Sequence, residues 1–216
     1  MDNKLDLIHI YNKLLNHYGE LNWWPADTPY EVMVGAILTQ NTAWSNVEKA
    51  IANFSGRLSP ELIETLPIPE LQEIIRPSGF YKQKALYLKN FTEWYRQYGY
   101  SVESVCQKPL SQLRKELLDI RGVGFETADS ILLYAFSYPT FVVDAYTKRL
   151  LERLQIDVKL NYTPIKDYFE SEVQGDARLY NNYHSLIVIN AKKHCNKKPI
   201  CDGCPLEFDC KFRLSG

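Results

Sequence analysis

Apolar residues recur every three to four positions along most of the chain, which is the spacing of amphipathic helices. Leu7, Tyr11 and Leu14 share one such face, and Gly19 follows as a stop signal. Thr28-Pro29 and Ser59-Pro60 each place a proline after a capping residue, as at a helix start. The pattern predicts helices over residues 5–18, 29–38, 44–54, 61–66, 70–75, 81–98, 110–118, 125–135, 145–154, 164–171 and 176–194.

Sheet-forming segments are almost missing from this pattern. Residues 141–143 (Phe-Val-Val) are β-prone, but the run is too short to build a sheet. We find no internal repeat, low-complexity segment or break in composition. The predicted fold class is therefore all-α, with many helices of modest length.

Composition adds limits on location and partners. The 216 residues contain no apolar run of membrane-spanning length, and no basic-then-apolar leader opens the chain. We therefore expect a cytoplasmic protein without membrane association. The net charge of −1 gives no support for a nucleic-acid partner, but backbone amides and a few local lysines can bind phosphate without an excess of basic residues.

A glycine turn, Gly122-Val123-Gly124, joins the helices predicted over residues 110–118 and 125–135. Glycines allow positive φ angles and leave backbone amides accessible, and a helix start adds partial positive charge, so the turn is a candidate anion site. The alternative is a pair of C-terminal capping glycines in an ordinary corner between two helices. The turn alone leaves both interpretations open.

The residues around this turn resemble a known signature. Residues 118–128 (Leu-Asp-Ile-Arg-Gly-Val-Gly-Phe-Glu-Thr-Ala), followed after an apolar helix by Val142-Val143-Asp144, resemble the helix-hairpin-helix and Gly/Pro-Asp signature of the endonuclease III superfamily of DNA glycosylases. The resemblance implies that the hairpin grips DNA phosphate through Ile120, Arg121, Gly122, Val123 and Gly124. It also implies that Asp144 is the catalytic acid.

The same resemblance implies a two-lobed arrangement. Residues 23–135 would form a helical bundle that carries the hairpin at about 110–135. Residues 1–22 would join residues 136–216 in a second lobe, which ends in an iron–sulfur cluster loop over residues 195–210. Asp144 would then lie at the groove between the two lobes.

Asp144 is suited to cleaving an N-glycosidic bond, because a carboxylate stabilises the positive charge that develops on the sugar or activates the attacking water. On its own, an aspartate that opens a helix is an ordinary N-cap. In family members that also nick the DNA backbone, a lysine follows the second hairpin glycine by two positions. Here that position is Glu126, which cannot form a Schiff base, so we predict a monofunctional glycosylase without AP-lyase activity.

Three further segments narrow the resemblance to the 3-methyladenine DNA glycosylase III branch: residues 23–25 (Trp-Trp-Pro), 35–42 and 76–85. By resemblance the base pocket is lined by Trp23, Trp24, Pro25 and Trp44, and a lysine matching Lys192 lies near it. Gln40 would fill the gap that the flipped base leaves. A cationic alkylated purine gains attraction from electron-rich indole faces. The alternative is that the tryptophans are ordinary core residues.

Four of the five cysteines gather near the C-terminus: Cys195, Cys201, Cys204 and Cys210. Without an export signal, such a cluster favours a metal or iron–sulfur site over disulfides, and the spacing alone leaves zinc open. The family resemblance favours a [4Fe–4S] cluster, although many relatives have one more residue between the first two cysteines and some members of the methyladenine branch lack the cluster. Cys106 is interpreted as an apolar filler, and His184 and His194 as structural residues.

We therefore expect base excision of a damaged purine, an alkylated one of the 3-methyladenine type, from double-stranded DNA by a monomeric enzyme. One alternative is an endonuclease III-like glycosylase for oxidised pyrimidines, with or without AP-lyase activity. The other is a non-catalytic DNA-binding protein that uses the hairpin alone.

Overall fold

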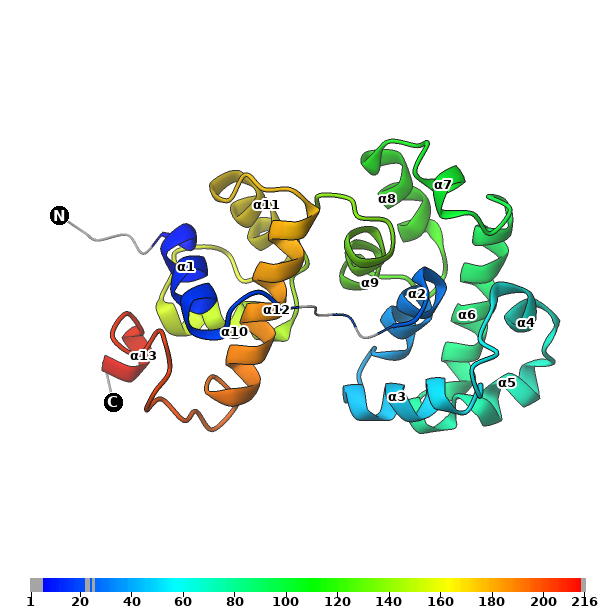
Figure 1. Cartoon of the computed structure of the whole chain (residues 1–216), viewed down its shortest axis with the longest axis horizontal. Coiled ribbons are helices and arrows are strands. Elements are labelled where there is room, and N and C mark those ends of the chain that lie inside the picture. Colours follow the sequence, from blue (N-terminus) through cyan, green and yellow to red (C-terminus); the bar gives the residue numbers. More distant parts are fainter. Residues whose placement is uncertain (1–5, 22–23, 25, 215–216) are drawn as a thin grey trace. The chain divides into compact units, whose positions relative to one another are not determined.

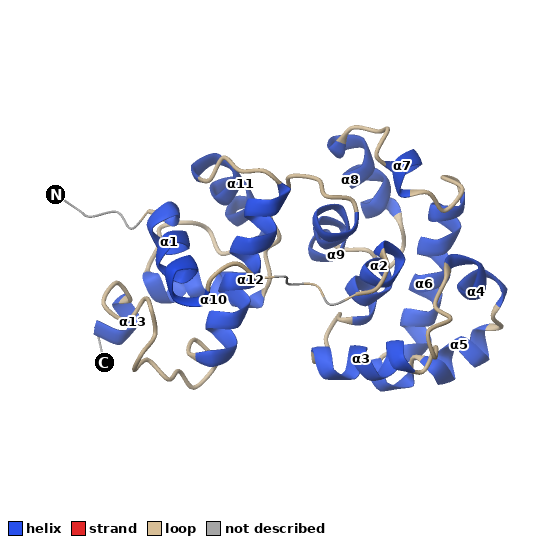
Figure 2. Ribbon diagram, in the orientation of Figure 1, coloured by secondary structure: helices blue, strands red, loops and turns tan. Residues whose placement is uncertain are grey.

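The computed structural model describes residues 6–21, 24 and 26–214, and helices are the only regular elements in that part of the chain (Figures 1 and 2). This confirms the all-α fold class. The chain divides into two compact units. One unit consists of Met1–Trp23 with Pro139–Gly216, and the other is the continuous segment Trp24–Tyr138.

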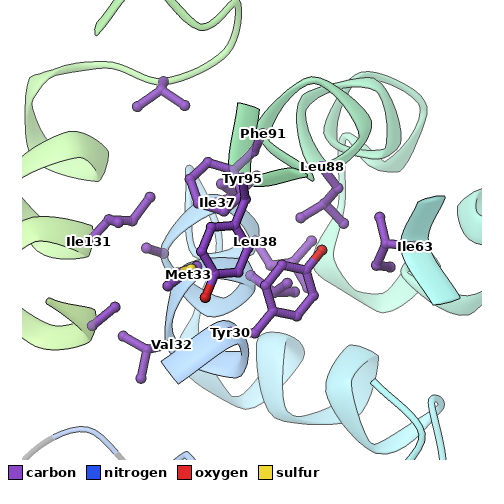
Figure 3. Close-up of a cluster of buried hydrophobic side chains, with 14 of the residues drawn as sticks. Tyr30, Val32, Met33, Ile37, Leu38, Ile63, Leu88, Phe91, Tyr95 and Ile131 are labelled. Carbon is purple, nitrogen blue, oxygen red and sulfur yellow. The ribbon is translucent and has the colours of Figure 1, made fainter. Parts of the chain in front are cut away.

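The continuous unit is built around a buried helix. It contains α2 (Pro29–Leu38), α3 (Trp44–Ala52), α4 (Pro60–Thr65), α5 (Ile68–Ile74), the short turn η1 (Arg76–Ser78), α6 (Tyr81–Arg96), α7 (Val102–Val105), α8 (Leu110–Asp119), α9 (Phe125–Ser130) and the π-helical turn η2 (Ile131–Ala135). Every residue of α2 from Val32 to Leu38 is buried. Helices α3, α6 and α9 and the turn η2 pack around it, and Met33, Ile37 and Leu88 lie inside the resulting core (Figure 3). The hydrophobic effect of this core holds the unit together.

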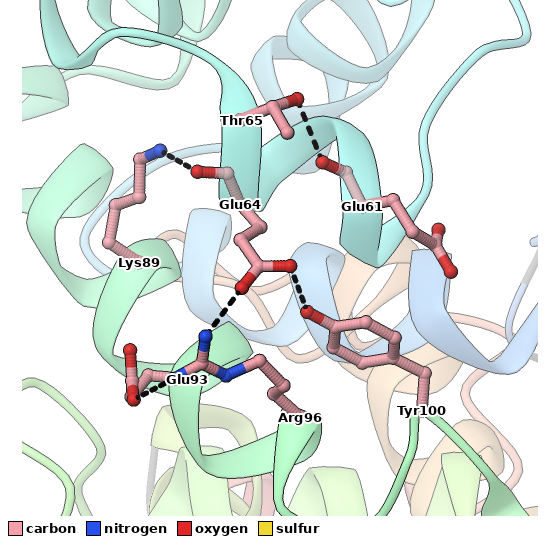
Figure 4. A network of polar contacts seen from close by, with 7 residues as sticks. All are labelled: Glu61, Glu64, Thr65, Lys89, Glu93, Arg96 and Tyr100. Atoms are coloured by element: carbon pink, nitrogen blue, oxygen red, sulfur yellow. Dashed lines mark hydrogen bonds and ion pairs between the residues drawn. The ribbon is translucent and has the colours of Figure 1, made fainter.

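A polar network fastens α4 to α6 at the surface of this unit. The Glu64 carboxylate accepts hydrogen bonds from Arg96 at 2.9 Å and from the Tyr100 hydroxyl at 2.6 Å, and Lys89 donates to the Glu64 carbonyl at 2.9 Å (Figure 4). Arg96 also pairs with Glu93 on its own helix. Because these groups are exposed, the network contributes less to stability than the buried core does.

The second unit joins both ends of the chain. It contains α1 (Leu7–Tyr18), α10 (Ala145–Leu154), α11 (Tyr162–Glu172), α12 (Ala177–Lys193) and α13 (Lys211–Leu214). Phe141 and Phe169 stack with their ring centroids 3.9 Å apart, and the buried Tyr183 hydroxyl donates to the Leu7 carbonyl at 2.7 Å. Helix α12 thus forms the common partner of α1 and α10.

The predicted helices are all present, with differences at their ends. Thr28 and Ser59 cap α2 and α4 through their hydroxyls, and Gly19 ends α1 at φ +74°, as their residue types predict. The helix predicted over residues 125–135 changes to a π-helical turn at Ile131. The short helices α7 and α13 were not predicted, because four residues are too few for a hydrophobic period to be recognised. Residues 141–143 form no strand. No helix in the described ranges is long and apolar enough to cross a membrane.

Candidate DNA-processing site

The glycine turn closes a hairpin between α8 and α9. The Val123 amide donates to the Ile120 carbonyl at 3.0 Å, and Gly122 has a φ of +103°. A Cβ atom on Gly122 would lie 2.2 Å from the Tyr87 ring of α6, whereas one on Gly124 would meet nothing within 4 Å. Only glycine therefore fits position 122, for both its backbone angle and its contact with Tyr87. Arg121 and Gly124 are exposed on the turn, and no side chain caps α9.

An ion pair with a buried carboxylate clamps the two hairpin helices. Arg114 of α8 donates from Nε and Nη2 to the two carboxylate oxygens of Asp129 on α9, at 2.7 and 3.0 Å. The Asp129 side chain is 0% exposed and that of Arg114 is 25% exposed, so solvent reaches the pair only from the arginine side. Asn90 of α6 also donates to the Arg121 carbonyl at 3.2 Å. The turn is thus supported from α6 as well as from its own helices.

Gln40, predicted to contact DNA, is hydrogen-bonded to the hairpin. Its side-chain amide donates to the Gly122 carbonyl at 2.9 Å and to the Thr127 hydroxyl at 3.0 Å. The segment between α2 and α3 is therefore tied directly to the hairpin. Any movement of Gln40 into DNA has to break both of these hydrogen bonds.

Aromatic side chains gather beside α2. Trp24 contacts Trp44 edge to face, with ring centroids 5.3 Å apart, and it contacts Tyr134 of η2 at 4.8 Å. Both indoles press on Gly35, where a Cβ atom would lie 3.4–3.5 Å from their rings. The Trp24 Nε1 atom is buried and has no hydrogen-bond partner in the described structure. Trp23 and Pro25 lie outside the described residues.

Two residues of this unit were missed as candidates. Tyr134 completes the aromatic group with Trp24, and its position one helix beyond the hairpin was the only signal in the sequence. Phe80 is 65% exposed and has a φ of +47°, a left-handed conformation that is uncommon for an aromatic residue. It follows Gly79 within residues 76–85, the segment that carried part of the family resemblance.

Asp144 opens α10 as its N-cap. Its Oδ1 atom accepts hydrogen bonds from the Thr147 amide at 2.7 Å and from the Thr147 hydroxyl at 3.0 Å. Its Oδ2 atom lies 3.5 Å from Nε2 of His184 on α12. Burial acts to raise the pKa of Asp144, but the partners His184 and Thr147 outweigh it, and the pKa is lowered overall. The carboxylate is therefore ionised at neutral pH, and one of its oxygens is fully committed to the helix cap.

The four C-terminal cysteines are half-buried and form no disulfide. Arg153 of α10 donates to Cys195 Sγ at 3.1 Å and its carbonyl accepts from Cys210 Sγ at 3.7 Å. Cys204 Sγ donates to Asn190 at 3.7 Å. Burial raises the pKa of the Cys204 thiol, and the nearby Cys195 and Cys210 add to that shift. The sulfurs of Cys195, Cys204 and Cys210 therefore lie beside the C-terminal ends of α10 and α12.

This set of donors suits an iron–sulfur cluster or a zinc ion by its chemistry, since four unpaired thiols lie in one short loop. Their positions do not complete such a site. Within the described ranges, no three His, Cys, Asp or Glu side chains are grouped closely enough to hold a metal ion. Lys192, the remaining candidate, is exposed in the last turn of α12.

The hairpin, Gln40 and the described aromatic residues belong to the continuous unit, whereas Asp144 and the cysteines belong to the unit formed by the two chain ends. Comparison with known proteins identifies the family to which this combination belongs. Residues 34–173 match the model of the HhH-GPD superfamily base excision DNA repair proteins.

Relatives match over nearly the whole chain. A provisionally named DNA repair glycosylase of Methanocaldococcus jannaschii is 51% identical over 215 residues, which are 97% of this chain and 98% of that protein. Endonuclease III of Sulfolobus acidocaldarius is 30% identical over 86% of this chain and 82% of its own length.

A solved structure agrees in fold as well as in sequence. The H. pylori 3-methyladenine DNA glycosylase MagIII, bound to 1,N6-ethenoadenine, superposes with a TM-score of 0.76 at 31% identity, covering 87% of this chain and 98% of that one. These matches confirm the predicted family. The chain belongs to the HhH-GPD superfamily of base excision DNA repair proteins and is a DNA repair glycosylase of the endonuclease III-like fold.

Proposed function

We propose that this protein is a monofunctional DNA glycosylase that hydrolyses the N-glycosidic bond of an alkylated purine of the 3-methyladenine type in duplex DNA. The observation that carries the proposal is the environment of Asp144. Its Oδ1 is held by Thr147, its Oδ2 faces His184, and its pKa is lowered. A carboxylate that is kept ionised and fixed in place is the group this reaction requires.

The chemistry assigns a defined task to each oxygen of Asp144. Breaking the glycosidic bond leaves positive charge on the sugar, and an ionised carboxylate stabilises that charge or orients the attacking water. Oδ1 accepts both Thr147 hydrogen bonds, so Oδ2 is the oxygen with acceptor capacity left for this task. His184 then limits the directions in which Oδ2 can point.

The aromatic residues support a cationic base as the substrate. A purine alkylated at a ring nitrogen such as N3 carries positive charge, is attracted to electron-rich ring faces and leaves without a strong general acid. Trp24, Trp44 and Tyr134 supply such rings in one cluster. Trp23, Pro25 and Lys192 are assigned to the base pocket by the family resemblance alone. The 31% identical MagIII, a 3-methyladenine DNA glycosylase bound to the modified base 1,N6-ethenoadenine, supports a modified purine as the substrate.

We assign DNA binding to the exposed turn and its neighbours. The backbone of residues 120–124 would hold a phosphate, and Gln40 would fill the space left by the flipped base after releasing Gly122 and Thr127. The exposed ring of Phe80 would press on the base stack, as apolar wedges do in other DNA-bending proteins. The proposed partner is thus duplex DNA that contains a damaged base, and the proposed enzyme acts as a monomer.

Glu126 supports the absence of a lyase step. It is exposed in the first turn of α9, at the position where bifunctional relatives are expected to carry the attacking lysine. A carboxylate cannot form the Schiff base on which backbone cleavage depends. The product would be an abasic site in an intact strand.

We also propose that Cys195, Cys201, Cys204 and Cys210 hold a [4Fe–4S] cluster, with a structural zinc as the alternative. When bound, the cluster would tie the four cysteines of this loop to one another. Arg149 donates to the Cys195 carbonyl at 2.7 Å, and Arg153 contacts the Cys195 sulfur. The guanidinium group of Arg153 would offset negative charge on Cys195 once that thiol is deprotonated as a metal ligand.

The proposal is tested by incubating the wild-type protein with duplexes that each contain one lesion: 3-methyladenine, 1,N6-ethenoadenine or an oxidised pyrimidine. Base release is measured by strand cleavage at abasic sites with and without alkali, and borohydride trapping reports any Schiff base. Release of alkylated purines that requires alkali for cleavage, and that Asp144→Asn abolishes while DNA binding remains, is the expected result.

Two other outcomes identify the competing functions. Release of oxidised pyrimidines alone would favour an endonuclease III-like substrate, which the similarity to the Sulfolobus acidocaldarius protein makes the second candidate. Binding of duplex DNA without release of any lesion would favour a non-catalytic binding protein. A trapped covalent adduct would overturn the monofunctional assignment whichever base is released.

A further inference from the structure

A lysine is buried inside the continuous unit without an acidic partner. Lys84, in the first turn of α6, is 2% exposed. Its ammonium group donates to the Leu38 carbonyl at 2.8 Å and to the Ser78 carbonyl at 2.7 Å, and none of the ion pairs in the described structure includes it. Burial lowers the pKa of Lys84 to about 8. An ionisable group is costly to bury, so this position is expected to serve a purpose that an apolar residue could not.

Both acceptors lie at the ends of helical elements. Leu38 is the last residue of α2, and Ser78 is the last residue of η1. Carbonyls at such ends lack partners within the helix and carry partial negative charge, which a lysine offsets. Lys84 therefore connects the C-terminal ends of α2 and η1, at Leu38 and Ser78, which are forty residues apart in sequence.

The segments that follow these two carbonyls carry the residues that we assign to DNA. Gln40 lies two positions after Leu38, and Phe80 lies two positions after Ser78. Gln40 in turn binds the Gly122 carbonyl and the Thr127 hydroxyl of the hairpin. Four hydrogen bonds, two from Lys84 and two from Gln40, thus connect three separate loops.

We propose that Lys84 is a positioning residue that fixes the spacing between the Gln40 segment (residues 39–43) and the Phe80 segment (residues 79–80). It touches no substrate, and it acts by setting where Gln40 and Phe80 meet the duplex. The proposal rests on the function proposed above, because it assigns those two side chains to base flipping. It predicts that loss of Lys84 disturbs the flipping step more than it disturbs the initial grip on phosphate.

Lys84→Met tests the idea, because methionine keeps much of the apolar stem and removes every donor. Base flipping is followed by the fluorescence of 2-aminopurine placed next to the lesion, and base release by single-turnover kinetics. We expect flipping and base release to fall about 10- to 100-fold, the range for small misplacements of reacting groups. Affinity for undamaged duplex should change little, since the hairpin contacts remain.

Thr92→Val is the matched control. Thr92 is buried on the same helix, and its hydroxyl bonds to the Tyr30 hydroxyl at 2.6 Å and to the Leu88 carbonyl at 2.8 Å rather than to either of the two segments. Its loss weakens the same unit without releasing Leu38 or Ser78. Equal losses of flipping in the two variants at equal loss of stability would show a merely structural role for Lys84 and overturn the proposal.

Hydrogen exchange gives a readout that does not depend on activity. Amides in residues 39–43 and 79–80 should exchange faster in Lys84→Met than in Thr92→Val, with α6 equally protected in both. If Lys84→Met does not fold, hydrogen exchange in the wild-type protein still tests the proposal. Amides of both segments that exchange as fast as in an unfolded chain, while those of α6 are protected, would overturn it. A wild-type protein that releases no base defeats the proposed function, whereas unchanged exchange in Lys84→Met defeats only the role of Lys84.

Discussion

Asp144 and His184 face each other inside one unit, with carboxylate Oδ2 3.5 Å from imidazole Nε2 and side chains that are 12% and 7% exposed. The two residues are forty positions apart in sequence and come from α10 and α12. Because burial would by itself raise the pKa of Asp144, the contact with His184 is one of the interactions that keep the carboxylate charged.

This contact predicts a pH effect. Since the pKa of Asp144 is lowered in the folded protein, its contribution to stability and its charged form are present above the ordinary aspartate range and are lost as pH falls through the folded value. His184→Leu removes this partner of Asp144 but leaves the carboxylate buried, so the pKa of Asp144 should rise. The pH below which the single-turnover rate falls should therefore increase by about one unit or more.

His184→Gln is the matched variant, since its amide can still donate to Oδ2 and should shift the limb less. Rates measured between about pH 3 and 8 compare the three proteins, because the pKa of Asp144 in wild type lies below the ordinary aspartate value. Superimposable profiles for the Leu variant and wild type would show that His184 does not control the ionisation of Asp144.

The two hairpin glycines should differ in what they contribute. Gly122→Ala forces a Cβ atom to within 2.2 Å of Tyr87 and holds alanine at φ +103°, so unfolding in urea should reveal a loss of about 1–3 kcal/mol or more. Gly124→Ala enters open space at φ −94° and should leave stability nearly unchanged. If Gly124 lets a phosphate approach the backbone, its alanine variant should still bind duplex DNA more weakly in fluorescence anisotropy. Equal stability of the two variants would contradict the role of Tyr87.

The clamp between the hairpin helices predicts a loss of stability as well. Asp129→Ala removes both acceptor oxygens of the pair, but the Arg114 side chain is 25% exposed, so the cost should be below about 3–5 kcal/mol, the range for breaking a fully buried ion pair. We expect a lower denaturation midpoint and weaker binding of undamaged DNA. Asp119→Ala, an exposed change at the end of α8, is the control and should lie within about 0.5 kcal/mol of wild type. A similar midpoint for both variants would mean that the clamp is not what orders the hairpin.

The cysteine loop makes a prediction about metal. Protein purified without oxygen should be brown and contain iron, and Cys201→Ser should lose both the colour and the iron. Cys106→Ser, at an exposed position in the other unit, should retain them. If the wild-type protein is colourless and contains zinc, the four cysteines form a zinc site and not a cluster site. Protein that contains neither iron nor zinc would refute the metal assignment.

The helices, their capping residues and the family were all accessible from the sequence, because proline-led caps, hydrophobic period and the hairpin glycines are local signals. The partners of the candidate site were not. His184 was interpreted as structural, and no local pattern shows that it lies against Asp144 from a different helix. Gln40 was assigned to DNA, and its contact with the Gly122 carbonyl eighty-two residues away likewise depends on packing. Lys84 lies within residues 76–85, which carried part of the family resemblance, but only the fold reveals that its side chain is buried.

The division of the chain into an inner segment and two outer ones has a consequence for synthesis on the ribosome. The inner segment, Trp24–Tyr138, is complete while residues 139–216 are still to be made, so its core can form first. Helix α1 emerges before the inner segment, yet the hydroxyl group that donates a hydrogen bond to the Leu7 carbonyl belongs to Tyr183, 176 residues later. Until α12 appears, the apolar face of α1 with Leu7, Ile10 and Leu14 has no permanent partner and is the surface that a chaperone would shield. The outer segment that is made after the inner one thus completes the outer segment that is made before it.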